Sequence, residues 1–414
     1  VLRLKNSLGL FEDPYKNIDN REEKVFLSNK ENLELARKLT TKTIVLLKNE
    51  NNILPLNHKQ KIALIGPYAD NIAILGSWSM FSDKSKITTL KEAFEAKIGK
   101  ENVIYTKGSE ILEEREINQI LQSDGGTMIH TENEEEKLTQ YLKEAKEAAK
   151  QADVIVLAIG EHYRQSGEAC SRANIDISNI QKRLVNELAK LNKKIVAIMF
   201  NGRPIVLRDI SEKVNGLLEA WFPGTEGANA IADIIFGYAN PSAKLTMSFP
   251  QATGQCPIYY NHYNTGRPHE SNVRYVSRYQ DIPTESYYPF GYGLSYSKFI
   301  YSCLNLSNKV LTKDSKIKVS VKIKNDSNRI GEEIVQLYIQ DLVAKVVRPV
   351  KELKAFQKVI ILPKQEKKVT FEISEDMLKF WDENLRYDSE NGDFKVYIGT
   401  NSEDTLFDIF SLKK

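Results

Sequence analysis

The chain has 414 residues, enough for two or three domains at roughly 100–200 residues each. Its 41% hydrophobic and 9% aromatic residues exclude a disordered chain, and 58 Lys and Arg against 55 Asp and Glu leave a net charge of +3 with both signs interleaved, so no nucleic-acid partner is indicated. The longest apolar runs, such as Val154–Gly160 and Ile195–Phe200, fall far short of the ~20 residues of a membrane-spanning helix, so no membrane partner is expected.

Few residues suggest a metal or a cofactor. Cys170, Cys256 and Cys303 lie far apart, without the spacing of a zinc site or a disulfide framework. No nucleotide-binding glycine motif and no GxSxG motif stands at a strand–helix junction. We therefore expect neither metal nor cofactor. The opening residues, VLRLKNSLGL, lack the pattern of a signal peptide and read like the middle of a gene product.

The first part of the chain alternates helical and extended patterns. Leu35, Leu39 and Leu46 predict a helix over Asn32–Lys48. The apolar runs predict strands at Lys61–Gly66, Val103–Tyr105, Asp153–Gly160, Lys194–Phe200 and Gly216–Ala220, and the 3.6-residue period predicts helices at Thr89–Ile98, Glu134–Gln151, Ile180–Leu191 and Thr225–Phe236. Continuous apolar strands between helices indicate an α/β sandwich, a mainly parallel sheet with helices on both faces.

The hydrophobic pattern changes in the last third of the chain. Residues 259–299 are rich in Tyr, Pro, Gly and Asn without a period, which indicates an ordered, aromatic connection. Beyond it, apolar residues alternate with polar ones, as in Ile317, Val319, Val321 and Ile323, and predict an all-β sandwich of the immunoglobulin type. The expected divisions are a leading segment with a linker helix (1–42), the α/β domain (43–258), the connection (259–299) and the β-sandwich (300–414).

The segment Gly160–Asp176 carries the densest set of reactive side chains. It leaves the C-terminal end of a predicted parallel strand, where open α/β sheets bind their ligands. Its functional side chains are Glu161, His162, Arg164, Glu168, Ser171 and Arg172. A carboxyl group on this small-residue loop could enter a cleft as a proton donor, or a Glu could pair with an Arg merely to hold the loop.

Other candidates have ordinary structural interpretations as well. Asp70 follows the first strand and is either a site residue or a helix cap. Trp78 and Trp221 are each either a platform for a sugar or a core residue. Gly224-Thr225-Glu226-Gly227 opens a helix that could bind an anion, although such glycine pairs are common at helix starts.

Ten segments in order carry a family resemblance. They are LGLFEDPY (8–15), TIVLLKNENNILPL (43–56), IALIGPYADN (62–71), GSWS (76–79), SGEACSRANIDI (166–177), NGRPIVL (201–207), EAWFPGTEGANAIADIIFGYANPSAKLTMSFP (219–250), YYNHYNTGRP (259–268), YPFGYGLSYS (288–297) and RPVKELKAFQKV (348–359). Together they resemble the C-terminal portion of a glycoside hydrolase family 3 enzyme, most like the bacterial periplasmic β-glucosidases.

The resemblance implies a fold and a role for three residues. The family has a barrel, then an α/β sandwich, then a fibronectin-III-like domain, and the resemblance begins after the barrel, so the nucleophilic aspartate is expected to be missing from this chain. Glu168 matches the general acid/base on the loop SGEACSR, with Arg172 orienting the loop and Glu161 lining the entrance. Some family members could instead keep this acid on the barrel.

Two functions remain open on the sequence. The chain is either part of a retaining exo-β-glucosidase, supplying the acid and one wall of the cleft, or a non-catalytic carbohydrate-associated module that is inactive by itself. The expected partners are a β-glucoside or oligosaccharide substrate, a barrel on a missing or separate segment, and a possible second copy in a homodimer. Resemblance also implies a periplasmic or secreted location, and we expect the β-sandwich to brace the α/β domain.

Overall fold

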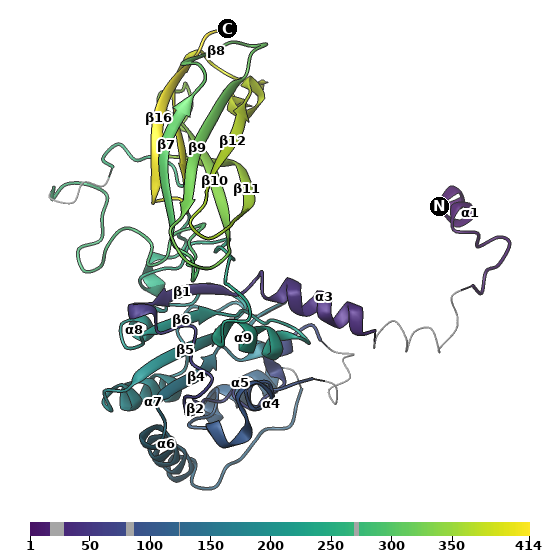
Figure 1. The fold of residues 1–414 in the computed structure, drawn as a ribbon, viewed down its shortest axis with the longest axis vertical. Coiled ribbons are helices and arrows are strands. Elements are labelled where there is room, and N and C mark those ends of the chain that lie inside the picture. The colour runs from purple at the N-terminus through teal and green to yellow at the C-terminus, as the bar shows by residue number, and fades with distance from the viewer. Residues whose placement is uncertain (17–28, 80–86, 124, 269–272) are drawn as a thin grey trace.

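The computed structural model describes residues 1–16, 29–79, 87–123, 125–268 and 273–414. An α/β domain and a β-sandwich stand end to end, with the short helix α1 (Leu2–Ser7) away from both (Figure 1). Among the described residues, no helix is both long and apolar enough to cross a membrane.

The α/β domain is built on a six-stranded sheet. Its order is β1-β6-β5-β4-β2-β3, and all neighbours are parallel except β1 and β6. The strands are β1 (Val45–Asn49), β2 (Ile62–Ile65), β3 (Val103–Thr106), β4 (Val154–Gly160), β5 (Lys194–Phe200) and β6 (Gly216–Glu219). The carboxyl ends of β4, β5 and β6 therefore meet at one edge of the sheet.

Helices cover both faces of this sheet, as the continuous apolar strands predict. Every residue of β4 is buried: Val154 and Val156 pack on the face of α4 and α9, and Ile155 and Leu157 on the face of α6 and α7. The helices are α3 (Lys30–Thr40), α4 (Leu90–Ile98), α5 (Glu114–Ser123), α6 (Glu134–Gln151), α7 (Asn179–Ala189), α8 (Arg208–Ser211) and α9 (Gly227–Ile235).

The predicted helix Asn32–Lys48 is wrong in its second half. Helix α3 ends at Thr40, and the chain then enters β1, which pairs with β6. The β-branched residues of Thr40-Thr41-Lys42-Thr43-Ile44-Val45 favour the extended chain, and Leu46 is buried in the sheet rather than on a helix face. Helix α5 was not predicted. The other predicted helices and strands agree with the structure to within two residues.

The C-terminal domain is a β-sandwich. One sheet has the order β11-β10-β15-β16-β8 and the other β12-β9-β7. Ile317, Val319, Val321 and Ile323 of β9 all point into the core, as their spacing predicts. The strands are β7 (Phe299–Leu306), β8 (Val310–Leu311), β9 (Ile317–Asn325), β10 (Gly331–Asp341), β11 (Glu352–Ile361), β12 (Glu366–Ile373), β13 (Phe380–Trp381), β14 (Tyr387–Asp388), β15 (Gly392–Gly399) and β16 (Thr405–Leu412).

The two domains share a polar interface. Lys244 Nζ lies 3.2 Å from a carboxylate oxygen of Glu333, and both side chains are buried. The hydroxyl of Tyr301 donates to the same carboxylate at 3.1 Å. Nearby, the side-chain amide of Asn240 donates to Ser297 Oγ and to the carbonyl of Ile330, each at 2.9 Å. These contacts join the end of the α/β domain to the first strands of the sandwich.

Candidate active site

Three neighbouring parallel strands deliver polar residues to one edge of the sheet. Glu161 follows β4, Asn201 and Arg203 follow β5, and Glu219 ends β6. Since carboxyl ends of adjacent parallel strands lie together, these side chains form one cluster. The loop 161–176, which the sequence singled out, starts from this cluster.

Glu161 lies inside the cluster. Its side chain is fully buried, and one oxygen lies 2.9 Å from Arg172 Nη1 and 2.9 Å from Arg203 Nε. The backbone N–H of Gly202 donates to the other oxygen at 3.2 Å. Two cationic partners and a hydrogen bond offset the desolvation cost of this buried carboxylate. These contacts match the interpretation in which a Glu–Arg pair holds the loop.

The same two arginines tie the loop at both ends. Arg203 donates to the carbonyls of Gln165 and Cys170, the second at 2.8 Å. Arg172 donates to the carbonyl of Asp176 at 2.9 Å. Glu168 sits between these anchor points with its side chain exposed to solvent. The arginines thus hold the loop through its backbone carbonyls and leave the carboxyl group of Glu168 exposed to solvent.

Gly160 lets the loop leave β4 close to β5. Its φ is +157°, and a Cβ added there would lie 1.9 Å from the carbonyl oxygen of Phe200. The next residue, Glu161, donates its N–H to that carbonyl at 2.7 Å, and its own carbonyl accepts from the hydroxyl of Tyr68 at 2.5 Å. A side chain at position 160 would push the whole loop away from the cluster.

Trp78 lies beside Gly167, the residue before Glu168. Trp78 is 66% exposed, and a Cβ added at Gly167 would lie 3.2 Å from Trp78 Nε1. Trp221, in contrast, is half-buried, with its ring centre 5.8 Å from that of Phe249. The core interpretation therefore holds for Trp221, and Trp78 presents an apolar face at the loop.

Asp70 and the helix start at Gly224–Gly227 have structural partners. Asp70 pairs with Lys91 at 3.3 Å and does not cap a helix. Glu226 precedes α9, where its carboxylate accepts from the side-chain amide of Asn229 at 3.0 Å. A glutamate at this helix start disfavours a bound anion.

His162 is a fixed neutral acceptor. Its Nδ1 accepts from the backbone N–H of Arg164 at 3.2 Å. Burial, with a smaller effect of the Arg164 charge, lowers the pKa of His162 to about 4. The imidazole is therefore uncharged at neutral pH and helps to shape the start of the loop.

Glu219 and Asn201 are residues that sequence reasoning missed. Glu219 is fully buried, and one of its oxygens accepts from the N–H of Trp221 at 3.0 Å. Burial raises the pKa of Glu219 well above its ordinary value, which favours the protonated acid. Its side chain interacts with Asn201, whose amide donates to the carbonyl of Arg203 at 2.8 Å. This chain of contacts links β6 to the arginine that anchors the loop.

Only the motifs could have pointed to these residues. Asn201 and Arg203 belong to NGRPIVL and Glu219 opens EAWFPGTEG, each at the end of a predicted strand. In the described parts of the chain, no three His, Cys, Asp or Glu side chains come together as metal ligands. The arrangement offers proton chemistry and hydrogen bonding at one sheet edge.

Comparison with known proteins places this site in a family. Residues 44–296 match the glycosyl hydrolase family 3 C-terminal domain, and residues 333–402 match a fibronectin type III-like domain. The chain therefore belongs to glycoside hydrolase family 3, with the α/β sandwich and the fibronectin-III-like domain that the resemblance implied. Both matches fit a C-terminal portion of a family member.

Individual relatives extend this finding. The chain is 39% identical over 410 residues to a periplasmic beta-glucosidase of Salmonella typhimurium, covering 97% of this chain and 53% of that protein. It is 31% identical to a beta-xylosidase of Formosa agariphila, covering 97% and 53%. A Listeria innocua beta-glucosidase mutant solved with laminaribiose superposes with a TM-score of 0.89 at 39% identity, covering 100% and 54%. The chain spans about half the length of these relatives.

Proposed function

We propose that this chain is the C-terminal portion of a retaining, exo-acting β-glucosidase that hydrolyses terminal non-reducing β-D-glucosyl residues. The observation that carries the proposal is the exposed Glu168 on a loop anchored by two arginines beside a parallel sheet edge. Glu168 protonates the leaving glycosidic oxygen and later takes a proton from the attacking water. Its match to the family's SGEACSR loop supports this role.

A second carboxylate must come from elsewhere. Retaining glycosidases need a nucleophile about 5–5.5 Å from the acid. In this family the resemblance puts that nucleophile on the barrel, which precedes the region matched here. Glu161 is buried and paired with Arg172 and Arg203, so it is not free to attack a sugar and serves instead to position the loop.

Exposed apolar residues support a covering barrel. Leu2, Leu4 and Phe11 near α1 are each more than half exposed, and Leu35 and Leu39 of α3 are similarly exposed. Such a set of apolar side chains is typical of a surface that another domain covers. Trp78 would then face the same cleft and offer its ring to the leaving group of the substrate.

One relative supports the cellular location. The Salmonella typhimurium relative is a periplasmic enzyme, which supports a periplasmic or secreted location for this protein. The choice between glucose and xylose depends on the barrel, because the relatives include enzymes named for each sugar. We assign glucose because the Salmonella and Listeria relatives share 39% identity with this chain, against 35% for a putative beta-xylosidase and 31% for a beta-xylosidase of Formosa agariphila.

The test separates a partial enzyme from a stand-alone module. Residues 1–414 alone are expected to give no turnover of an aryl β-glucoside, because one of the two carboxylates is missing. The native gene product is expected to exceed 47.2 kDa and to be active. An inactive native product of 47.2 kDa would contradict the proposal and favour the non-catalytic module.

A further inference from the structure

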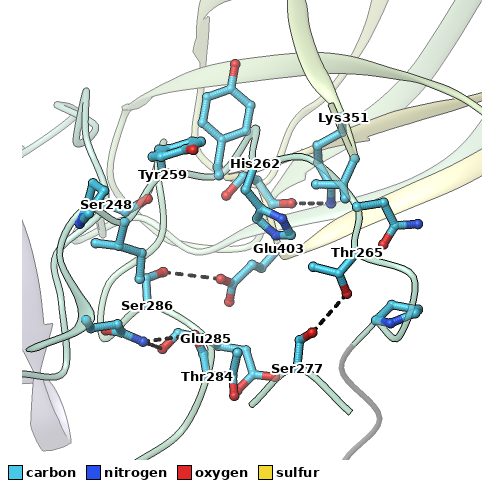
Figure 2. Close-up of a pocket in the computed structure, with 18 of the residues that line it drawn as sticks. Ser248, Tyr259, His262, Thr265, Ser277, Thr284, Glu285, Ser286, Lys351 and Glu403 are labelled. Carbon is cyan, nitrogen blue, oxygen red and sulfur yellow. Dashed lines mark hydrogen bonds between the residues drawn. The ribbon is translucent and has the colours of Figure 1, made fainter. Parts of the chain in front are cut away.

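A pocket lies where the connection meets the β-sandwich, and none of the residues that line it belongs to the loop 161–176. Its walls are formed by residues between 248 and 286, by Val350 and Lys351 just before β11, and by Ser402 and Glu403 between β15 and β16. The cavity volume is about 440 Å³, within the range of about 300–1,000 Å³ for small-molecule sites. Figure 2 shows His262 and Glu403 near its middle, with Thr265 and Ser277 on one side and Ser286 on the other.

Backbone hydrogen bonds between the two segments preform this pocket. The N–H of Val350 donates to the carbonyl of His262 at 2.9 Å. The N–H of Ser402 donates to the carbonyl of Phe290, also at 2.9 Å. Since the walls are fixed to each other in this way, a ligand needs little ordering of the protein on binding.

Tyrosines supply the apolar side of the pocket. The ring of Tyr260 is stacked on Phe290 with centres 4.4 Å apart, and its hydroxyl accepts from the N–H of Leu353 at 3.1 Å. This ring is therefore a fixed wall. Tyr259 is 48% exposed, and Tyr279 is partly exposed with its hydroxyl donating to the carbonyl of Gly254 at 3.4 Å. Exposed tyrosine faces of this kind can stack against the C–H face of a pyranose ring.

Charged groups in the pocket retain unused hydrogen-bonding capacity. Lys351 donates to the carbonyl of Ser402 at 2.6 Å and lies 4.6 Å from the ring centre of Tyr397. Glu403 accepts from the hydroxyl of Ser286 at 3.3 Å. In the described part of the chain, neither Lys351 nor Glu403 forms a close ion pair, although their opposite charges attract each other across the pocket. Burial lowers the pKa of Lys351 and raises that of Glu403, so both are in a partly desolvated space.

This chemistry selects a neutral ligand with many hydroxyl groups. One lysine against two glutamates, Glu403 and Glu285, does not favour an anion such as a phosphate. Donors and acceptors of both signs beside tyrosine rings match vicinal hydroxyls on an apolar ring face. We propose that this pocket is a non-catalytic binding site for a neutral β-glucosyl oligosaccharide. The glucosyl identity rests on the proposed function, whereas the ligand class rests on the pocket.

The pocket is connected to the candidate active site through a short chain of contacts. Tyr279, in its wall, bonds Gly254, which follows Thr253. The Thr253 hydroxyl accepts from the N–H of Ile175 at 3.5 Å, at the end of the loop that carries Glu168. The wall of the pocket and the end of the loop that carries Glu168 are therefore joined through residues 253 and 254.

Calorimetric titration of residues 1–414 with cellobiose and with cellotetraose tests the proposal without any turnover. Saturable binding is expected, and Tyr259→Ala and Glu403→Gln are each expected to weaken it about tenfold, the effect of losing one contact of roughly 1.4 kcal/mol. Tyr275→Ala, an exposed tyrosine outside the pocket walls, and Glu168→Gln are expected to bind like the wild type.

Two results would overturn the proposal. One is the absence of saturable binding by either sugar. The other is binding that survives Tyr259→Ala and Glu403→Gln but is lost in Glu168→Gln, because the ligand would then occupy the catalytic cleft. If Glu403→Gln unfolds early in a thermal melt, Tyr259→Ala decides alone, since its half-exposed ring makes no hydrogen bond within the described residues. Neither result depends on whether Glu168 is the catalytic acid.

Discussion

Three glutamates at one sheet edge occupy three different environments. Glu168 is exposed on the loop, Glu161 is buried between two arginines, and Glu219 is buried with burial raising its pKa. Of the three, Glu168 is the exposed one, and it is the residue for which we propose the acid role. The others hold the loop in place, one as an ion-paired carboxylate and the other as a neutral acid.

Replacing Glu219 tests its neutral state. The folded protein keeps a proton on Glu219 that the unfolded chain releases above its ordinary pKa of 4.5, so the free energy of unfolding should fall as pH rises from there. Glu219→Gln should abolish this decline and be at least as stable as the wild type near neutral pH. Glu219→Ala should cost about 2–4 kcal/mol through a cavity. Urea unfolding across pH measures both, and parallel wild-type and Gln profiles would refute the neutral state.

The low pKa of His162 predicts that the protein loses stability at acidic pH. Its pKa is lowered from 6.5 to about 4, so its contribution is complete above pH 6.5 and is lost as pH falls toward 4. The loss is about 3 kcal/mol at most. An NMR titration of the His162 ring should give this low pKa, and His162→Asn should flatten the acid side of the stability profile. A measured pKa at or above 6.5 would contradict the buried neutral imidazole.

Sequence reasoning could predict the loop of the site but not its supports. Glu168, Glu161 and Arg172 stand in one segment after an evident strand, so their proximity is readable from the sequence. Arg203 and Glu219 come from separate strands. Their burial depends on the order of the strands in the sheet, which local sequence patterns do not predict. The burial of Glu161 likewise depends on Arg203, which lies 42 residues along the chain.

At the scale of elements, the junction of β4 and its loop is the critical point. Helical and strand periods predicted most elements, because buried parallel strands are continuous apolar runs. The boundary between α3 and β1 was missed, because Leu46 continues the helical spacing of Leu35 and Leu39 although it lies in β1. Within the described residues, Leu35 and Leu39 of that helix are each more than half exposed.

Gly160→Ala tests this junction. The added Cβ would meet the carbonyl of Phe200 at 1.9 Å, so we expect a loss of about 3 kcal/mol or more and faster proteolysis within the loop. Gly125→Ala is the matched control, since Gly125 also has a positive φ, +68°, but faces open space. It should cost only about 1 kcal/mol from backbone strain. Equal losses in the two variants would show that the close approach to β5 is unimportant.

At the scale of the whole molecule, the order of the two domains was predictable and their interface was not. The switch from helical to alternating periods marks the change of architecture near residue 300. The buried pair of Lys244 and Glu333 joins residues 89 positions apart, and nothing local to either predicts it. This interface gives the bracing hypothesis a physical basis.

Breaking that pair tests the brace. Lys244→Met leaves Glu333 buried without its cation and should lower the free energy of unfolding by about 3–5 kcal/mol, whereas the double change Lys244→Met with Glu333→Leu should recover much of the loss. Lys316→Met, which breaks an exposed pair with Glu372, should leave the free energy of unfolding nearly unchanged. If removing residues 300–414 left the melting temperature of the remainder unchanged, the brace would be excluded.

The acid role of Glu168 is the central claim, and leaving-group dependence tests it most directly. In the native gene product, Glu168→Gln should slow hydrolysis of an alkyl β-glucoside by about 10²–10⁴-fold, because its leaving oxygen needs a proton. Cleavage of the glycosidic bond in a dinitrophenyl β-glucoside, followed as the pre-steady-state release of dinitrophenol, should slow far less, because that leaving group needs none. Glu147→Gln, an exposed glutamate on α6, is the control and should leave both unchanged. An equal loss on both substrates, or no loss, would contradict the assignment of Glu168 as the general acid.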